Sequence, residues 1–395
     1  MTTPILVLNC GSSSVKYQMI DIDSEEVLAS GLVEKIGLNS GNITHTTEGL
    51  MYTIEENIPD HTAALALVTR AFHKWGPELD TAVAVGHRAV HGGELFSETT
   101  VITDKVIEGL VDLSGLAPLH NPPAIAGIRA AQAMLPDVPH VAIFDTAFFS
   151  TLPAEAYTYA IDRTIAEKYH IRKYGFHGTS HSYVSKKAAE FMGRDLASVN
   201  QIVCHLGNGA SISAIQGGVA VETSMGLTPL AGLVMGTRSG DIDPGLFSYL
   251  LRQANMDSQA VDDMLNKRCG MAGMADGSSD FRDVHAKIEA GDEHAQLALD
   301  VYVHRLIFYI GAYMAILGKV DFIVFTAGVG ENDNRTRAAI ISRLEGFGVH
   351  LDPELNTPRN RKPTLISSTD SSIVVLVVPT NEELAMARET YRVIN

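Results

Sequence analysis

Two arginines and one histidine lie in glycine-rich segments, where their side chains could bind anions and assist phosphoryl transfer. Arg88 lies in GHRAVHGG, Arg238 in MGTRSG and His177 in GFHGTSH. A guanidinium binds carboxylate and phosphate oxygens in a fixed bidentate geometry, and an imidazole N–H can donate to oxygens that gain charge in a transition state. These residue types favour a site for anionic substrates over a pair of ordinary surface salt bridges.

A polar turn near the N-terminus is a second candidate for phosphate binding. The segment 5–17, ILVLNCGSSSVKY, reads as a buried strand that turns at Gly11 and continues as another strand. Ser12, Ser13, Ser14 and the local backbone N–H groups form a set of donors, and Lys16 adds a cation, which suits a polyphosphate. The common phosphate loop leads into a helix instead, so the turn could also be an ordinary polar hairpin.

The second half of the chain repeats this layout. A strand at 201–206, a glycine-rich turn at 207–211 and strands at 212–215 and 219–222 follow the order of residues 5–33. The repetition predicts an α/β protein with a duplicated two-lobe fold. It resembles the actin, Hsp70 and hexokinase superfamily, whose RNase H-like lobes enclose an active-site cleft between the lobes.

Periodicity and capping residues predict the elements that position these motifs. A strand at 141–144 ends at Asp145, and carboxylates at this end of a strand usually face the functional crevice of an α/β sheet. His120 precedes a helix expected from Asn121, its N-cap, to about Met134. Further helices are expected at 61–75, 105–112, 292–317 and 380–395, the last with a Thr380–Glu383 capping box, further strands at 82–85, 322–326 and 373–378, and a loop at 327–332.

The composition favours a cytoplasmic protein over a nucleic-acid-binding or membrane protein. The chain has 395 residues, more than a single core usually holds, and a net charge of −16 without a basic run. Its three cysteines show no disulfide or zinc spacing, and its N-terminus lacks the basic region of a signal peptide. The apolar stretch 301–317 contains His304 and Arg305, which favours a core helix over a membrane span.

The motifs together resemble those of the acetate kinase family. In order along nearly the whole chain they read NCGSSSVK, GHRAVHGGE, APLHNPP, FDTAFF, YGFHGTSH, CHLGNGAS, TSMGLTPL, MGTRSGDIDP, SSDFRD, FTAGVGEN and PTNEE. The family transfers a phosphoryl group between ATP and acetate, giving acetyl phosphate and ADP, with Mg²⁺, for which Mn²⁺ can substitute. The resemblance implies this reaction, a homodimer, and two lobes at 1–147 with 383–395 and at 148–382.

The resemblance also implies a role for each motif residue. Arg88 would hold the acetate and Arg238 the transferring phosphoryl group, while His177 would donate to its equatorial oxygens. Acetate is already ionised near neutral pH, so we expect Asp145 to position Arg88 and the acetate rather than to act as a base. The acyl group would contact Val90, Leu119, His120, Phe176 and Pro229. The nucleotide would contact Ser12, Ser14, Lys16, His205, Asn208, Gly209, Asp280, Phe281, Arg282, Gly328, Val329, Gly330 and Asn332, and Asn9 and Glu382 would lie near Mg²⁺.

Other assignments fit parts of the pattern. The same scaffold could serve propionate or butyrate, and an ATP-driven binding or filament module of the Hsp70 or actin type would share the fold. His177 with His181, and His87 with His91, have an H-x₃-H spacing that could hold zinc, although neither pair has the metalloprotease glutamate.

The chain departs from the family pattern at a few positions to which no chemistry is assigned. These are Phe149, Ala231 and the pair Arg268-Cys269. The departures put peripheral loop contacts in doubt, but not the implied reaction.

Overall fold

The computed structural model describes residues 2–358 and 361–395, and the chain divides into two compact units. Unit 1 contains the chain up to Ser150 together with Asn381–Asn395, and unit 2 contains Thr151–Thr380. The sequence places the lobe boundaries at 147/148 and 382/383, whereas the compact units change at 150/151 and 380/381. Each unit contains one sheet, and the two are described separately below.

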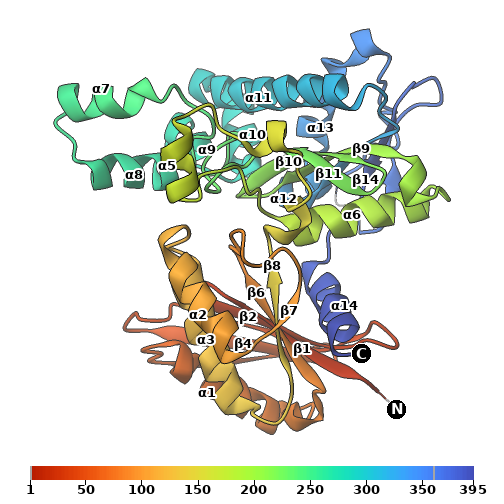
Figure 1. The fold of residues 1–395 in the computed structure, drawn as a ribbon. Helices are drawn as coiled ribbons and strands as arrows, with labels where there is room; N and C mark the ends of the chain where they lie inside the picture. The colour runs from red at the N-terminus through yellow and green to blue at the C-terminus, as the bar shows by residue number, and fades with distance from the viewer. Residues whose placement is uncertain (1, 359–360) are drawn as a thin grey trace. The chain divides into compact units, whose positions relative to one another are not determined.

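Unit 1 is built on a sheet of eight strands in the order β5-β4-β3-β2-β1-β6-β8-β7 (Figure 1). Strands β1 to β5 form an antiparallel meander, and β1, β6 and β8 run parallel. The strands are β1 (Pro4–Cys10), β2 (Ser14–Asp21), β3 (Val27–Glu34), β4 (Gly41–Thr47), β5 (Leu50–Glu56), β6 (Ala84–Ala89), β7 (Thr100–Val101) and β8 (His140–Phe144).

Helices cover both faces of this sheet (Figure 1). On one face lie α1 (His61–Trp75), α2 (Asp104–Asp112) and α3 (Asn121–Met134), and on the other lies the C-terminal α14 (Glu382–Ile394). The helix α1 begins where Asp60 accepts a hydrogen bond from the Ala63 N–H, and its apolar side packs on the buried faces of β1 and β2. The carboxyl ends of β1, β6 and β8 therefore share one edge of a well-covered sheet.

Unit 2 contains a sheet of six strands in the order β11-β10-β9-β12-β14-β13. The helix α6 (Gly178–Phe191) packs against β9 and β12, and the long helix α11 (Glu293–Leu317) packs against β9 and β10 (Figure 1). The strands are β9 (Asn200–Leu206), β10 (Ala210–Gln216), β11 (Val219–Thr223), β12 (Phe322–Thr326), β13 (Thr364–Leu365) and β14 (Val374–Val377). The other helices of the unit are α4 (Ala154–Tyr157), α5 (Arg163–Lys168), α7 (Gly245–Gln253), α8 (Ser258–Lys267), α9 (Gly270–Met274), α10 (Phe281–Glu289), α12 (Ala327–Asn332) and α13 (Asn334–Ser342).

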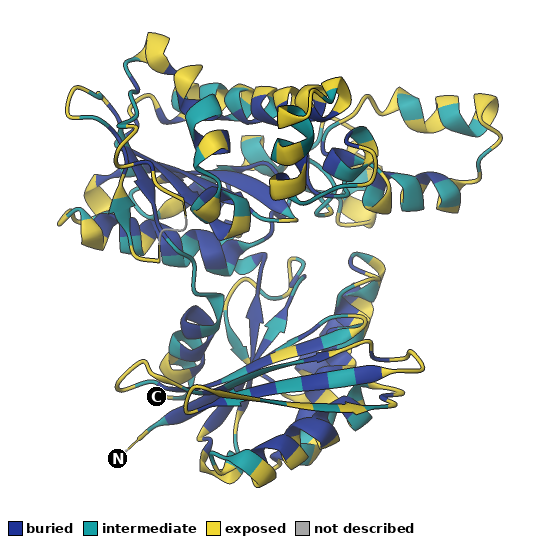
Figure 2. Cartoon of the chain, turned by 180° about the vertical axis from the view of Figure 1, so that it is seen from behind, coloured by how far each residue is buried: buried dark blue, intermediate teal, exposed yellow. Residues whose placement is uncertain are grey.

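The two sheets share one topology. The order β3-β2-β1-β6-β8 in unit 1 corresponds to β11-β10-β9-β12-β14 in unit 2, with matching parallel and antiparallel pairings. In both units the central strands are buried along nearly their whole length (Figure 2). The predicted duplicated α/β fold, with a polar turn between the first two strands of each sheet, is confirmed.

Three local predictions were wrong. Asn121 does not cap α3, because its side chain binds the backbone of His91, accepting from its N–H at 3.3 Å and donating to its carbonyl at 3.1 Å. The last helix is capped by Asn381, which accepts from the Leu384 N–H, rather than by Thr380. Residues 327–332, expected as a loop, form the short helix α12.

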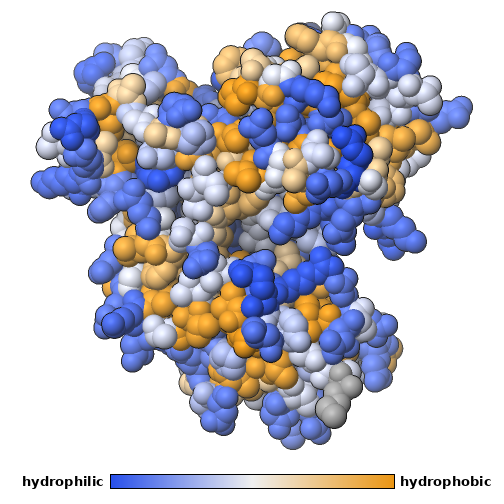
Figure 3. All heavy atoms as spheres, turned by 45° about the vertical axis from the view of Figure 1, so that its right-hand side comes forward, coloured by the Kyte–Doolittle hydropathy of each residue, from blue (hydrophilic) through white to orange (hydrophobic). Residues whose placement is uncertain are grey.

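The helix α11 forms part of the core of unit 2, as its interrupted apolar sequence predicts. By length and composition alone it could cross a membrane. One side of it is buried against the sheet and against α9, α10 and α13. The other side exposes apolar residues, among them Leu297, Phe308 and Ile316. Figure 3 shows hydrophobic residues at the surface, among hydrophilic ones, on one face of the molecule.

Candidate active site

The structure places Arg88 and Asp145 together in unit 1. Arg88 is the fifth residue of β6, and Asp145 directly follows β8, its parallel neighbour. Arg88 donates from Nε to Asp145 Oδ1 at 2.9 Å and from Nη2 to Oδ2 at 2.6 Å. Asp145 is buried, and Arg88 is about one fifth exposed. This is a bidentate ion pair, whose geometry fixes the guanidinium plane.

Further carboxylates surround the Arg88 guanidinium. Burial alone lowers the pKa of Arg88, but the charge and hydrogen bonds of Asp145, together with Glu382 and Glu383, raise it above its usual value. Burial raises the pKa of Glu382, and the charges of Asp145 and Glu383 add to that effect, while Arg88 and Lys16 oppose it. Acidic groups therefore outnumber the cations here, which favours binding of an additional cation.

Asn9 and Glu382, the predicted metal-binding residues, both belong to unit 1. Asn9 lies near the end of β1, opposite Lys16 in the β1–β2 pairing, and Glu382 is the first residue of α14, which packs on β1 and β6. Both side chains offer oxygen ligands, as Mg²⁺ prefers. The residues present therefore fit a divalent cation, because a partly buried carboxylate with a raised pKa gains from a nearby positive charge.

The first polar turn has the backbone geometry that the sequence predicts, but Lys16 is already paired. The Gly11 N–H donates to the Ser14 carbonyl at 2.8 Å, and His61 Nε2 donates to the Gly11 carbonyl at 2.8 Å. Ser12 is exposed at the tip of the turn, and Lys16 forms an ion pair with Glu383. The lysine is thus held beside the acidic groups of α14.

The predicted acyl-pocket residues are divided between the two units. Val90 and His120 in unit 1 are half-buried, whereas Leu119 is 55% exposed. In unit 2, Phe176 is buried and Pro229 is half-buried. Val90 directly follows β6, two positions after Arg88. Within unit 1, most of the Leu119 side chain is therefore not packed against other apolar residues.

The second polar turn lies beside His177 and Arg238 in unit 2. A Cβ placed on Gly209 would be 3.5 Å from the Nε2 of His177 and 3.6 Å from Nη1 of Arg238. The Gly236 N–H donates to the Asn208 carbonyl at 2.8 Å, which ties the turn to the loop that carries Arg238. The turn, the histidine and the arginine therefore form one cluster of hydrogen-bond donors.

Arg238 and His177 both have features that are common at functional sites and unusual in residues that only stabilise the fold. Arg238 donates to the Pro229 carbonyl at 3.0 Å, and no carboxylate among the described residues pairs with it. Burial lowers its pKa, as expected for a guanidinium without a counter-charge. His177 has a φ of 60° at the N-cap of α6, a left-handed conformation that is strained for a residue with a Cβ.

A chain of buried hydroxyl and imidazole groups leads from His177 into unit 2, and no sequence motif predicts it. Ser211 Oγ lies 2.9 Å from His177 Nδ1 and 2.7 Å from His181 Nε2, and Ser213 Oγ lies 2.7 Å from His181 Nδ1. The His205 ring stacks on His177 at 4.4 Å between centroids. Both ring nitrogens of His181 bind serine hydroxyls, so the alternative of a zinc site at His177 and His181 is not supported.

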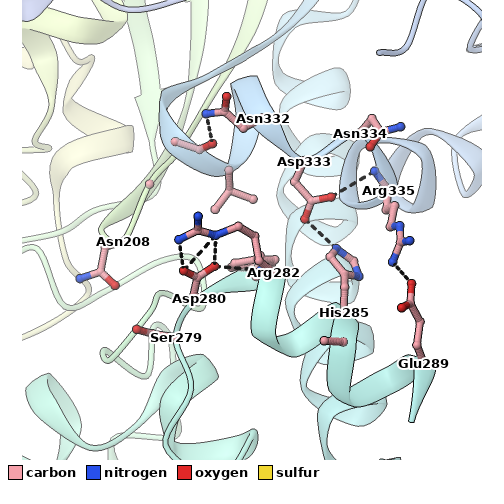
Figure 4. Close-up of a pocket in the computed structure, with 15 residues that line it drawn as sticks. Asn208, Ser279, Asp280, Arg282, His285, Glu289, Asn332, Asp333, Asn334 and Arg335 are labelled. Atoms are coloured by element: carbon pink, nitrogen blue, oxygen red, sulfur yellow. Dashed lines mark hydrogen bonds and ion pairs between the residues drawn. The ribbon is translucent and has the colours of Figure 1, made fainter. Parts of the chain in front are cut away.

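A cavity of about 740 Å³ opens beside the second turn (Figure 4). Most of the predicted nucleotide-binding residues of unit 2 line it, whereas His205, Gly209 and Gly330 do not. The lining residues that were predicted are Asn208, Asp280, Phe281, Arg282, Gly328, Val329 and Asn332. Asp280 caps α10 by accepting from the Arg282 N–H, and it also pairs with the Arg282 side chain, which lowers the pKa of Asp280 to about 2.

The cavity is also lined by charged residues that no sequence motif predicts, on α10 and at the start of α13. His285 donates from Nε2 to Asp333 Oδ2 at 2.8 Å, and Asp333 also caps α13, so this pair joins α10 to α13. Glu289 and Arg335 form a second ion pair between the same helices at 2.6 Å (Figure 4). His285 and Glu289 are four residues apart on the amphipathic helix α10, and charged residues at this spacing usually indicate a solvated surface. Only the tertiary structure shows that they line a cavity.

Two further residues hold the short helix α12 in place. Glu331 accepts from the Ala327 N–H at 2.8 Å and from the Thr380 N–H at 3.0 Å. Arg337 is fully buried and donates to the Gly330 carbonyl at 2.8 Å, and burial lowers its pKa to about 10. These contacts compensate for the left-handed φ of 64° at Ala327.

Comparison with known proteins gives one consistent result. The model of the acetokinase family matches residues 4–388. A curated relative, the acetate kinase of Clavibacter michiganensis subsp. michiganensis, is 53% identical over 388 residues, which cover 98% of each chain. The crystal structure of Porphyromonas gingivalis acetate kinase is similar with a TM-score of 0.95 at 42% identity and full coverage of both chains. A propionate kinase from Francisella tularensis subsp. tularensis is similar with a TM-score of 0.93 at 41% identity and 99% coverage of both chains.

Proposed function

Because the chain belongs to the acetokinase family, we propose that it transfers a phosphoryl group between ATP and acetate, forming acetyl phosphate and ADP reversibly. The observation that carries this conclusion is the family match over residues 4–388, together with curated relatives of the same activity and nearly the same length. The chain is thus a kinase whose acceptor is a carboxylate. Both substrates are anions, so the main task of the site is to neutralise charge and to align the reacting groups.

Arg88 is proposed to bind the acetate carboxylate. Asp145 occupies the Nε–Nη2 edge of the guanidinium, so acetate would be met at the Nη1 side. Asp145 would act by holding this orientation, because acetate has no proton for a base to remove near neutral pH. The methyl group of the acetate would meet apolar side chains such as Val90, with Leu119, His120, Phe176 and Pro229 as further candidates.

His177 and Arg238 are proposed to bind the phosphoryl group as it transfers. The observations that support this role are their shared position at Gly209 and the lack of a carboxylate at Arg238 among the described residues. Fixed donors of this kind stabilise charge that develops on the equatorial oxygens without reorganising during the step. Transfer would then proceed in line from the γ-phosphate to an acetate oxygen, with no covalent enzyme intermediate.

Mg²⁺ is the proposed metal, with Mn²⁺ as a substitute. When bound, it would neutralise charge on the phosphate oxygens. Asn9 and Glu382 would hold it, directly or through water, because they offer the oxygen ligands that this ion requires. Ser12, Ser14 and Lys16 would serve the phosphates from the first turn, and Asn208 and Gly209 from the second.

The cavity beside α10 and α12 is the proposed adenosine site. Its volume of about 740 Å³ falls within the range of cofactor-sized pockets. Phe281, Gly328 and Val329 supply apolar or backbone surface for a base, and Asp280, Arg282 and Asn332 supply polar groups. His205 and Gly330 would support the turn and α12 rather than line the cavity.

Trapping of the product with hydroxylamine tests the proposed function. Acetyl phosphate reacts to a hydroxamate, so ATP, Mg²⁺ and acetate should give hydroxamate in proportion to ADP. Release of ADP without hydroxamate would favour an ATP-driven binding module instead. The assay should be repeated with propionate and butyrate, because the similarity to a propionate kinase specifically favours propionate as an alternative acceptor.

We also propose that the protein is a cytoplasmic homodimer. The exposed side of α11 carries Leu297, Val301, Phe308 and Ile316 at helical spacing, and an apolar stripe of this kind is typical of a protein–protein interface. Phe308→Asp should convert the dimer to a monomer in size-exclusion chromatography with light scattering. An exposed substitution elsewhere in unit 2, Tyr249→Asp, is the matched control. A wild-type protein that is monomeric in this measurement would contradict the proposal.

A further inference from the structure

We infer that Ser213, His181 and Ser211 form a directed hydrogen-bond chain that keeps His177 neutral and protonated on Nε2, the nitrogen that faces the second polar turn. The inference rests on the proposed function in one respect, because it takes His177 as the donor to the transferring phosphoryl group. The three residues are positioning residues, since they would act on the substrate only through His177. No motif assigns them a role, and the H-x₃-H spacing of His177 and His181 would otherwise be unexplained.

The chain joins one helix to one strand by simple periodicity. His177 and His181 are four residues apart at the start of α6, so they lie on the same side of the helix. Ser211 and Ser213 are two residues apart in β10, so they lie on the same face of the sheet. The two pairs interleave with distances of 2.7, 2.7 and 2.9 Å between successive polar atoms, starting from Ser213 Oγ.

The direction of the chain follows from counting hydrogens, beginning at Ser213. Ser213 is fully buried, and within the described residues its hydroxyl has one hydrogen-bond partner, His181 Nδ1. A buried hydroxyl must donate its hydrogen, so Ser213 donates and His181 Nδ1 accepts. Burial and the neighbouring His205 hold the pKa of His181 well below its usual value, so its ring is neutral and its hydrogen is on Nε2.

The remaining steps are then determined. His181 donates from Nε2 to Ser211 Oγ, and Ser211 must pass its own hydrogen to its other partner, His177 Nδ1. His177 Nδ1 is therefore an acceptor, and the ring hydrogen of His177 is on Nε2. Nε2 also lies on the side of the ring that faces Gly209, because a Cβ placed on Gly209 would be 3.5 Å from it. The reverse direction would present a bare Nε2 lone pair to the anionic phosphoryl oxygens, which would repel them.

The direction can be measured on the wild-type protein. Long-range ¹H–¹⁵N correlation of histidine-labelled protein distinguishes protonated from bare ring nitrogens, and the spectrum of His177→Gln identifies the His177 signals. We expect a bare Nδ1 and a protonated Nε2 at His177. Protonation of His177 on Nδ1, alone or together with Nε2, would overturn the inference. This measurement needs no enzyme activity, so it is decided independently of the proposed function.

Substitution of Ser211 tests whether the chain matters for catalysis. Ser211→Ala should lower kcat about tenfold, because a less well-oriented donor stabilises the developing charge less, while the KM values for acetate and ATP change by less than about twofold. Ser211→Thr retains a hydroxyl and should restore most of kcat. Ser185→Ala removes another buried hydroxyl of α6, whose one hydrogen bond within the described residues goes to the Ser182 carbonyl, and it should leave kcat unchanged.

The outcomes separate the two claims. An unchanged kcat in Ser211→Ala, or an effect on KM alone, would overturn the role of the chain. If Ser211→Ala does not fold, as judged by circular dichroism, the wild-type spectrum decides the inference alone. A wild-type enzyme that forms no hydroxamate would contradict the proposed function but would leave the tautomer of His177 as measured.

Discussion

Asp145 binds the Nε–Nη2 edge of the Arg88 guanidinium with two hydrogen bonds of 2.9 and 2.6 Å, and both residues lie at the carboxyl ends of adjacent parallel strands. The pair is not simply a structural salt bridge, because Arg88 keeps a further donor edge and is partly exposed. A bidentate partner on one edge fixes where the other edge points. In the proposed acetate site, the buried Asp145 carboxylate would thus orient the arginine that binds the substrate carboxylate.

Substitution of Arg88 should separate charge from geometry. Arg88→Ala should lower kcat/KM for acetate at least about a hundredfold, because it removes a preorganised cation from a site for two anions. Arg88→Lys keeps the charge but not the planar fork, so it should recover only part of this loss. Arg70→Ala, which removes an exposed arginine of unit 1, is the control. Activity near that of the wild type in folded Arg88→Ala would refute the assignment.

His177 should act mainly in the transition state. His177→Ala should lower kcat far more than it raises either KM, since a donor aimed at developing charge gains strength only as the reaction proceeds. His294, exposed in α11, provides a matched His→Ala control in the same unit. Steady-state kinetics with varied ATP and acetate give both parameters. A change confined to KM would show instead that His177 binds the ground state.

The sequence predicts the strands and helices well where local patterns decide them. The helix 61–75 and the hairpins at Gly11 and Gly209 follow from periodicity and turn residues alone. Asn121 fails as an N-cap because a distant backbone segment, at His91, competes for its side chain. The prediction of a loop at 327–332 fails for a similar reason. The glycine-rich sequence does favour a loop, but contacts of Glu331 and Arg337 stabilise the helix α12 instead.

The candidate site was predictable only for residues that stand in distinctive motifs. Arg88, His177 and Arg238 are flanked by glycines, which is unusual for surface charges. Arg337 and Ser213 have no such context, and each acquires its role from partners far away in the chain, at Gly330 and His181. Burial of an arginine or a serine is decided by packing, which a single sequence does not reveal.

Unit 1 should lose stability in mild acid because of a buried histidine pair. His87 Nε2 donates to His140 Nδ1 at 2.9 Å, and His140 donates to the Leu135 carbonyl. Burial lowers the pKa of both rings, and at His87 the charge of His140 lowers it further. The unfolded chain takes up protons as the pH falls below about 6.5, whereas the folded unit does not. The free energy of unfolding should therefore fall with decreasing pH from about 6.5, by up to about 1.4 kcal/mol per pH unit for each ring.

Trp75 allows this loss to be followed in unit 1 alone. It is the single tryptophan of the chain and stacks on Tyr52 at 4.6 Å, so its fluorescence reports unfolding of this unit. Urea titrations at several values between about pH 7.5 and 5 give the free energy of unfolding as a function of pH. The slope of this dependence should be smaller for His87→Gln, which keeps a donor for His140 but cannot be protonated. His73→Gln, at an exposed position of α1, should retain the wild-type slope. Equal slopes for His87→Gln and the wild type would exclude the pair as the cause.

Val90 should limit the length of the acyl chain. It follows β6 two positions after Arg88 and is half-buried, and in the proposed acetate site its side chain would contact the methyl group of the bound carboxylate. One extra methylene changes binding in an apolar pocket by only about 1–3 kcal/mol. The wild type should therefore use propionate, but less efficiently than acetate.

Val90→Ala makes room for the additional carbon, and it should lower the KM for propionate and raise the KM for acetate. Its kcat should change much less, because the contacts to the phosphoryl group are untouched. Measurement of both acceptors on both proteins decides the point. If the propionate-to-acetate ratio of kcat/KM does not rise in Val90→Ala, then Val90 does not line the acyl pocket. If the wild type already prefers propionate, then acetate is not its principal substrate.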